Sequence, residues 1–167
     1  MTEDRLSLIP FYQGWDMYQQ LLVQAITPLT PDQLALRSAP HMLSIGQLVT
    51  HVVATRVGWF HMWMGEGSPN IAQLAAWDEN EEPSRAATEL VAGLETTWQM
   101  IQQALARWTP ADLEQAFQNP YVSETERKEK PARSRQWIIW HVLEHDLHHG
   151  GEVSQALGMH GLVGLDL

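Results

Sequence analysis

Apolar residues recur every three or four positions along four long segments of the chain. In the first segment this spacing gives the stripe Leu8, Phe11, Trp15, Tyr18, Leu22 and Ala25. The others run from Ser44 to about Gly65, from Ser84 to Trp108, and from Ser134 to Gly158. Such spacing places apolar side chains on one face of an α-helix. Since no segment of any length alternates as a strand does, the pattern predicts four amphipathic helices.

Four such helices predict an all-α fold, a four-helix bundle. The connecting segments are too long for a minimal up-down bundle, so we expect one or two long crossover connections, in an order that patterns do not reveal. Thr30–Leu34 and Thr109–Leu113 both begin Thr-Pro, which predicts two capped short extra helices. Residues 118–133 are expected to form a long irregular loop with a short hairpin. At this length, residues 1–167 form a single domain.

Composition narrows the range of functions. The chain has 20 acidic and 10 basic residues, and this net charge of −10 argues against a nucleic-acid-binding surface. It has no cysteine, which excludes disulfides, zinc–thiolate sites and a cysteine nucleophile. No apolar run approaches the roughly 18 residues of a membrane span, and residues 1–5 lead into no signal-peptide core. We expect a cytoplasmic protein that acts on a small molecule, without nucleic-acid or membrane partners.

Charged residues gather in two places outside the predicted helices. Five of the ten basic residues lie in and just after the predicted loop: Arg127, Lys128, Lys130, Arg133 and Arg135. This group is interpreted either as a patch that attracts the carboxylates of an acidic ligand or, more simply, as a solvated loop with glutamates interleaved. The acidic run at 78–82 is interpreted as solvated loop rather than as a site.

The histidines of the fourth helix suggest a metal site. Its apolar arc is centred on Ile138, Val142, Val153 and Ala156. His145 and His149 fall inside this arc, about 40° apart and one turn apart, so their ring nitrogens can converge on one ion. In the second helix, His51 lies at the edge of the apolar face and can meet this pair across the core. The three histidines either form a metal site in the bundle interior, with coordination positions left open for water or a ligand, or are interior histidines that ordinary hydrogen bonds satisfy.

Two acidic residues near these histidines each have two interpretations. Asp146 lies well inside the apolar arc, where an unpaired carboxylate is costly. It either orients a ligating imidazole or a bound water, or it forms a structural pair with a buried partner such as Arg56. Glu152, on the margin, is either an outer ligand or general base, or an exposed helix residue. Gly150 and Gly151 cost the helix about 1 kcal/mol each relative to Ala, which suggests that a helix or ligand approaches the backbone there.

Several of these segments resemble a known family. The segment 141–152, which begins His-Val-Leu-Glu-His-Asp, and the earlier segment 44–51, Ser-Ile-Gly-Gln-Leu-Val-Thr-His, are similar to the DinB-like (damage-inducible) superfamily. The resemblance implies a four-helix bundle that binds a divalent metal ion through His51, His145 and His149, frequently as a homodimer.

The resemblance has one departure. Superfamily members often have the pattern His-His-Arg-Gly-Gln, whereas here Gly150 stands at the Arg position and Glu152 replaces the Gln. A lost Arg is a lost clamp for an anion. This departure weakens any transfer of the family's substrate contacts to this chain, although its metal ligands are unaffected.

The better-understood branches of the superfamily use a low-molecular-weight thiol, which implies an S-transferase or isomerase. A histidine-rich site suits zinc, nickel, copper or iron, and the sequence does not choose among them. Because the chain has no cysteine, the thiol would come from a small molecule such as bacillithiol, mycothiol or glutathione, and a Trp-rich cavity would hold the electrophile. Two other functions fit the same residues: a metal-dependent hydrolase with Asp146 or Glu152 as base, and a non-catalytic metal- or ligand-binding stress protein.

Overall fold

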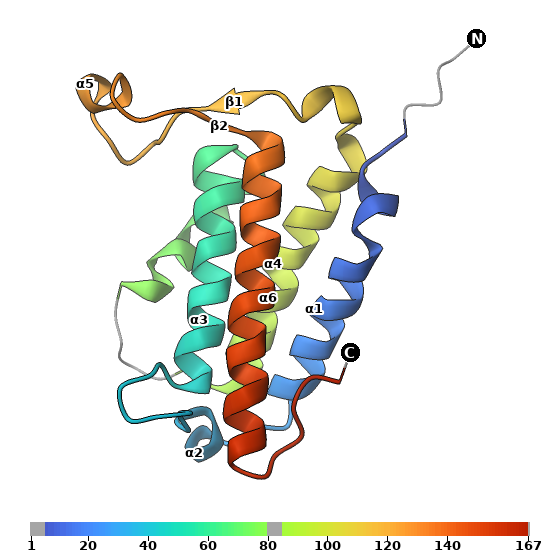
Figure 1. Ribbon diagram of the computed structural model, residues 1–167, viewed down its shortest axis with the longest axis vertical. Helices are drawn as coiled ribbons and strands as arrows, with labels where there is room; N and C mark the ends of the chain where they lie inside the picture. Colours follow the sequence, from blue (N-terminus) through green and yellow to red (C-terminus); the bar gives the residue numbers. More distant parts are fainter. Residues whose placement is uncertain (1–5, 80–84, 167) are drawn as a thin grey trace.

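Four long helices make up most of the computed structural model, which describes residues 6–79 and 85–166 (Figure 1). The long helices are α1 (Gln13–Ile26), α3 (Ile45–Arg56), α4 (Ala87–Arg107) and α6 (Arg135–Met159). The shorter elements are α2 (Pro31–Leu34), α5 (Glu124–Arg127), β1 (Ala116–Phe117), β2 (Arg133–Ser134), a π-helical segment (Val57–Trp63) and 3₁₀ segments (Ile9–Tyr12, Pro69–Asp78, Pro110–Asp112). The predicted all-α four-helix bundle is confirmed.

The direction of the helices explains the length of the connection between α3 and α4. Helices α1 and α6 run one way and α3 and α4 run the other way (Figure 1). Each of α3 and α1 packs on both α4 and α6. Since α3 and α4 are parallel, the chain must return between them, and the 3₁₀ segment Pro69–Asp78 of this crossover packs along α3. The expected crossover is present, although residues 80–84, including the Ser84 predicted to begin the third helix, lie outside the described residues.

The local signals for helix ends and turns are confirmed where the structure describes them. Helix α2 begins with a capping box of Thr30 and Gln33, and α3 begins with one of Ser44 and Gln47. The second Thr-Pro motif forms the 3₁₀ turn Pro110–Asp112. The short hairpin expected within residues 118–133 is not formed there. Instead, the two-residue strands β1 and β2 pair antiparallel at the two ends of this loop.

The apolar stripe of the first helix is interrupted at Phe11. Leu8, Trp15, Tyr18 and Leu22 are buried as predicted, but Phe11 is 68% exposed. Phe11 lies in the 3₁₀ turn that contains Pro10 and precedes α1. A 3₁₀ turn has about 3.0 residues rather than 3.6, so the helical phase shifts before α1 begins. The α-helical periodicity therefore does not apply at Phe11.

A fully buried ion pair joins the four long helices. The Arg56 guanidinium of α3 donates to the Asp146 carboxylate of α6, with an Nη2–Oδ2 distance of 2.7 Å. The Trp15 indole of α1 donates to the same carboxylate oxygen at 2.7 Å. Arg56 Nη1 donates to the Leu94 carbonyl and the Thr97 hydroxyl of α4, both at 3.3 Å. Arg56 and Asp146 thus neutralise each other, and further hydrogen bonds satisfy their remaining donor and acceptor atoms, as a buried ion pair requires.

The paired glycines of α6 have different surroundings. A Cβ atom on Gly150 would lie 2.1 Å from the Tyr18 hydroxyl oxygen, whereas a Cβ on Gly151 would meet nothing within 4 Å. The Tyr18 hydroxyl also donates to the Leu147 carbonyl at 3.2 Å. The expected close approach is thus confirmed at Gly150, where α1 contacts the backbone of α6, but not at Gly151.

These surroundings predict opposite effects on stability. In Gly150→Ala the new methyl group must displace Tyr18, so we expect a loss of about 1–3 kcal/mol in the free energy of unfolding. In the matched control Gly151→Ala the methyl group is free, and the better helix propensity should add up to about 1 kcal/mol. Urea denaturation of both variants measures the difference. Equal midpoints for the two variants would mean that the contact between α1 and α6 does not constrain this position.

Candidate metal centre

Three histidine side chains converge in the seam between α3 and α6. His51 comes from α3, and His145 and His149 lie one turn apart on α6. The Nε2 atoms of His51 and His145 are 3.0 Å apart. One ring nitrogen of each histidine lies within 4.8 Å of those of the other two. The structure thus brings together the three residues that the sequence predicted as metal ligands.

Two of the three imidazoles are hydrogen-bonded to carboxylates through their Nδ1 atoms. His51 Nδ1 lies 2.7 Å from Asp78 Oδ2, and His149 Nδ1 lies 2.6 Å from Glu152 Oε2. Because an ionised carboxylate only accepts hydrogen bonds, each Nδ1 carries the proton and each Nε2 keeps its lone pair. Carboxylates behind the ligating histidines are common in metal sites, where they fix the ring and raise its basicity.

His145 is the most buried of the three imidazoles. Its Nε2 lies 3.4 Å from the Thr55 hydroxyl oxygen, and its buried Nδ1 has no hydrogen-bond partner among the described residues. Burial, reinforced by the neighbouring histidines, lowers the pKa of His145 to about 3. Burial also lowers the pKa of His149, although Glu152 opposes this shift. His145 therefore stays neutral at pH 7, the state that metal coordination requires.

The chemistry of this donor set fits a divalent transition-metal ion. At 3.0 Å, His51 Nε2 accepts a hydrogen bond from the Nε2–H group of His145, and a cation that takes the place of this proton would be bound by both nitrogens. Neutral imidazole is a common ligand for zinc, nickel, copper and iron. Three nitrogen donors leave coordination positions open, as in catalytic rather than structural sites.

The location of the cluster corrects one expectation. The sequence placed the histidines in the bundle interior, but the His51 side chain is 30% exposed and that of His149 is 15% exposed. The position that faces the core belongs to Asp146, which is fully buried beside Arg56. His145 precedes Asp146, and successive helix residues differ by about 100° in direction. The cluster therefore lies at the edge of the core, with two of its side chains partly exposed to solvent.

The two predicted catalytic carboxylates have different positions. All the described hydrogen bonds of the Asp146 carboxylate come from Arg56 and Trp15. This geometry matches the structural-pair interpretation of Asp146 and gives no support to the catalytic one. Glu152 lies beside the cluster through its contact with His149, which matches an outer carboxylate of a metal site.

Sequence reasoning missed Asp78. It was interpreted as the first residue of a solvated acidic loop, yet it contacts His51. Glu79 is exposed as expected, and the rest of that run lies outside the described residues. The preceding residue, Trp77, is half-buried and explains why Asp78 is held in place. A tryptophan next to the acidic run was the available signal, because a large aromatic ring tends to anchor the segment that carries it.

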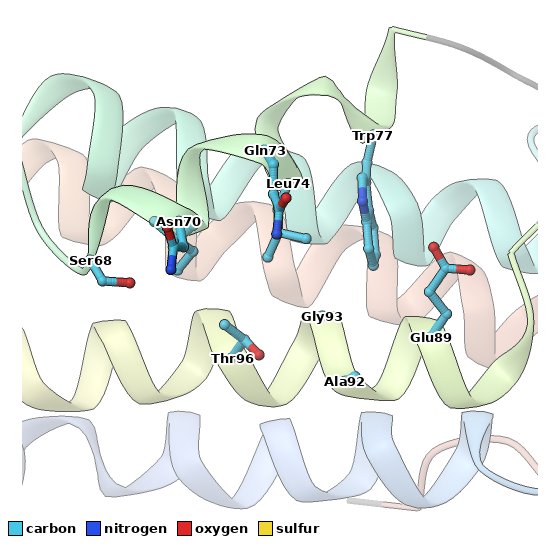
Figure 2. Close-up of a pocket in the computed structure, with 10 residues that line it drawn as sticks. Ser68, Asn70, Gln73, Leu74, Trp77, Glu89, Ala92, Gly93 and Thr96 are labelled. Atoms are coloured by element: carbon cyan, nitrogen blue, oxygen red, sulfur yellow. The ribbon is translucent and has the colours of Figure 1, made fainter.

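Trp77 anchors the crossover on α4. Its ring points from the 3₁₀ segment toward α4 near Gly93, beside a pocket of about 230 Å³ (Figure 2). A Cβ on Gly93 would lie 2.7 Å from this ring, so only glycine leaves room for it. The Arg85 guanidinium covers the ring at 4.2 Å from the centroid. With Trp77 fixed in this way, the next residue, Asp78, is held beside His51.

This arrangement predicts that Asp78 strengthens metal binding. Asp78→Asn removes the charge behind His51 and should weaken the affinity for zinc or nickel by about 10- to 100-fold. A competition titration with a chromogenic chelator measures the affinity. Glu79→Gln, which removes the neighbouring exposed carboxylate, is the control and should match the wild type. An unchanged affinity in Asp78→Asn would contradict the support inferred for His51.

Comparison with known proteins identifies the family. The family sequence model that describes the DinB superfamily matches residues 13–153. A crystal structure of a DinB-like protein from Bacillus cereus ATCC 10987 superposes with a TM-score of 0.70, at 15% sequence identity, covering 98% of this chain and 99% of that one. At this identity the likeness concerns the fold. The search among curated proteins gave no match, and within the described residues no helix has the length and apolar character to cross a membrane. The chain belongs to the DinB superfamily.

Proposed function

We propose that this protein binds a divalent transition-metal ion through His51, His145 and His149 and is an enzyme that uses an external thiol. The observation that carries the proposal is the convergence of three ring nitrogens within 4.8 Å, two of the rings being oriented by carboxylates. Zinc, nickel, copper and iron all suit this donor set. Membership of the DinB superfamily supports the same site.

The chain's own residues would prepare the site before any substrate binds. Asp78 and Glu152 fix two rings with their Nε2 lone pairs directed inward, and burial keeps His145 neutral. A bound divalent ion with open positions would lower the pKa of a thiol or water and so supply a nucleophile at neutral pH. Since the chain has no cysteine, the thiol must belong to a small molecule. The partial exposure of His51 and His149 would let such a molecule reach the cluster.

S-transfer or isomerisation is the reaction type that we propose. Hydrolysis by an activated water, with Glu152 as the available base, and metal binding without turnover are the two alternatives that the tests below separate. The homodimer and the cytoplasmic location expected from the sequence remain predictions.

Metal content tests the site directly. Untagged wild-type protein should contain about one metal ion per chain, measured by elemental analysis after gel filtration. His51→Ala and His145→Ala should each contain almost none, because two nitrogen donors bind an ion weakly. His41→Ala, at an exposed position, is the control and should keep the metal. Wild-type metal content in His51→Ala would overturn the three-histidine site.

Turnover tests the reaction. The metal-loaded protein should conjugate or isomerise an electrophile only with a low-molecular-weight thiol, and both a chelator and His149→Ala should abolish this activity. His41→Ala, at an exposed position away from the cluster, is again the control and should keep the activity. Ester or amide cleavage without a thiol would instead identify a hydrolase. Tight metal binding with no turnover on either panel would refute an enzymatic function.

A further inference from the structure

The five clustered basic residues have different environments in the structure. Arg127, Lys128 and Lys130 are exposed on and after α5. Arg135 is buried and donates hydrogen bonds to the Asp112 carbonyl and the Gln115 side chain. Arg133, in β2, is half-buried. For the first three the solvated-loop interpretation fits, and Arg135 has a structural partner, so Arg133 remains to be explained.

The Arg133 guanidinium is fixed in position but not paired. Its Cζ lies 4.3 Å from the centroid of the Trp137 ring. Among the described residues no carboxylate lies within ion-pair distance of it and no acceptor takes a hydrogen bond from it. Stacking uses the face of the guanidinium and leaves the N–H groups at its edge free for a planar anion. Arg85 differs, because it covers Trp77 in a similar way but is paired with Glu89 at 2.8 Å.

Three rings, those of Trp137, His141 and Trp59, form an aromatic row between Arg133 and the histidine cluster. The rings of Trp137 and His141 are stacked, with centroids 4.8 Å apart and an interplanar angle of 17°. Trp59 packs edge-on against both of these rings, at 5.4 and 5.0 Å. The His141 ring lies 6.4 Å from that of His145. All of these rings except Trp59 come from α6, which begins directly after β2 (Figure 1), so the row follows one helix from the hairpin to the cluster.

Arg133 and Glu144 act on His141 in opposite directions. Burial lowers the pKa of His141, the exposed carboxylate of Glu144 opposes this shift, and Arg133 adds a smaller lowering. The protein as a whole carries a net charge of −10 and repels anions. The unpaired Arg133, which lies against uncharged aromatic rings, is therefore a positive position on a negatively charged protein, and a small anion can bind there.

We propose that Arg133, Trp137 and His141 form a subsite for the carboxylate of a small planar organic acid. The carboxylate accepts hydrogen bonds from the edge of the Arg133 guanidinium, and the body of the acid lies against the partly exposed margins of the Trp137 and Trp59 rings, whose faces already contact Arg133, His141 and Trp63. The ligand then lies at the hairpin end of the aromatic row, whose other end is the contact between His141 and His145. The use of this subsite, to orient a co-substrate, rests on the proposed function, whereas the binding itself needs no metal ion.

Benzoate and its uncharged analogue benzamide test the subsite in chelator-treated, ¹⁵N-labelled protein at constant ionic strength. The readout is the NMR signals of the Arg133 Nε–H and of the Trp59 and Trp137 indole N–H groups. Benzoate should shift these three signals saturably, and benzamide should bind about tenfold more weakly because it lacks the charge-assisted hydrogen bonds. Elemental analysis tests the metal site separately, so the two proposals can fail independently.

Two variants complete the test. Arg133→Gln should remove the preference for benzoate, while Arg85→Gln, which changes the paired arginine stacked on a different tryptophan, should retain it. Both circular dichroism spectra should match the wild type. The subsite is refuted if benzoate and benzamide bind equally, if Arg133→Gln keeps the preference, or if no saturable shift occurs at the named signals.

Discussion

The buried ion pair between Arg56 and Asp146 is the interaction on which the rest of the structure depends. It joins α3 to α6 at the centre of the core, and Trp15 and α4 supply its remaining hydrogen bonds. Leaving either charge unpaired there would cost about 3–5 kcal/mol. Asp146 follows His145 directly, and Arg56 is in the same helix as His51. The pair therefore fixes the register of the two helices, and this register brings the Nε2 atoms of His51 and His145 to 3.0 Å.

Neighbouring residues of α6 differ in burial, because one side of the helix faces the core and the other side faces the protein surface. Asp146 is fully buried and charged, with a cation to balance it, whereas His145 and His149 lie toward the seam and stay partly accessible. Burial disfavours protonation of the imidazoles. Asp78 and Glu152 direct two of them. Helix α6 thus provides both Asp146 of the buried ion pair and two of the three histidines of the cluster.

The segments between the helices complete this arrangement. The crossover after α3 is anchored by Trp77 against Gly93 and brings Asp78 to His51. The hairpin before α6 places Arg133 over Trp137, at the other end of the aromatic row. The bundle alone gives converging histidines, and its connections provide charged groups around them. This division is common, because rigid helices position a site while the segments between them supply its variable chemistry.

The sequence by itself determined the features whose cause lies within a few residues. Capping boxes, the Thr-Pro turns, the helical stripes and the i,i+4 spacing of His145 and His149 each depend on one turn or one helix, so the pattern predicts them. Helix directions, the exposed side of the cluster and the contact of Asp78 with His51 depend on how distant segments pack. The spacing of residues along the chain does not predict these three features. The register of α3 on α6 follows from burying Arg56 and Asp146, and the path of the crossover follows from packing Trp77 against α4. Only the tertiary structure decided them.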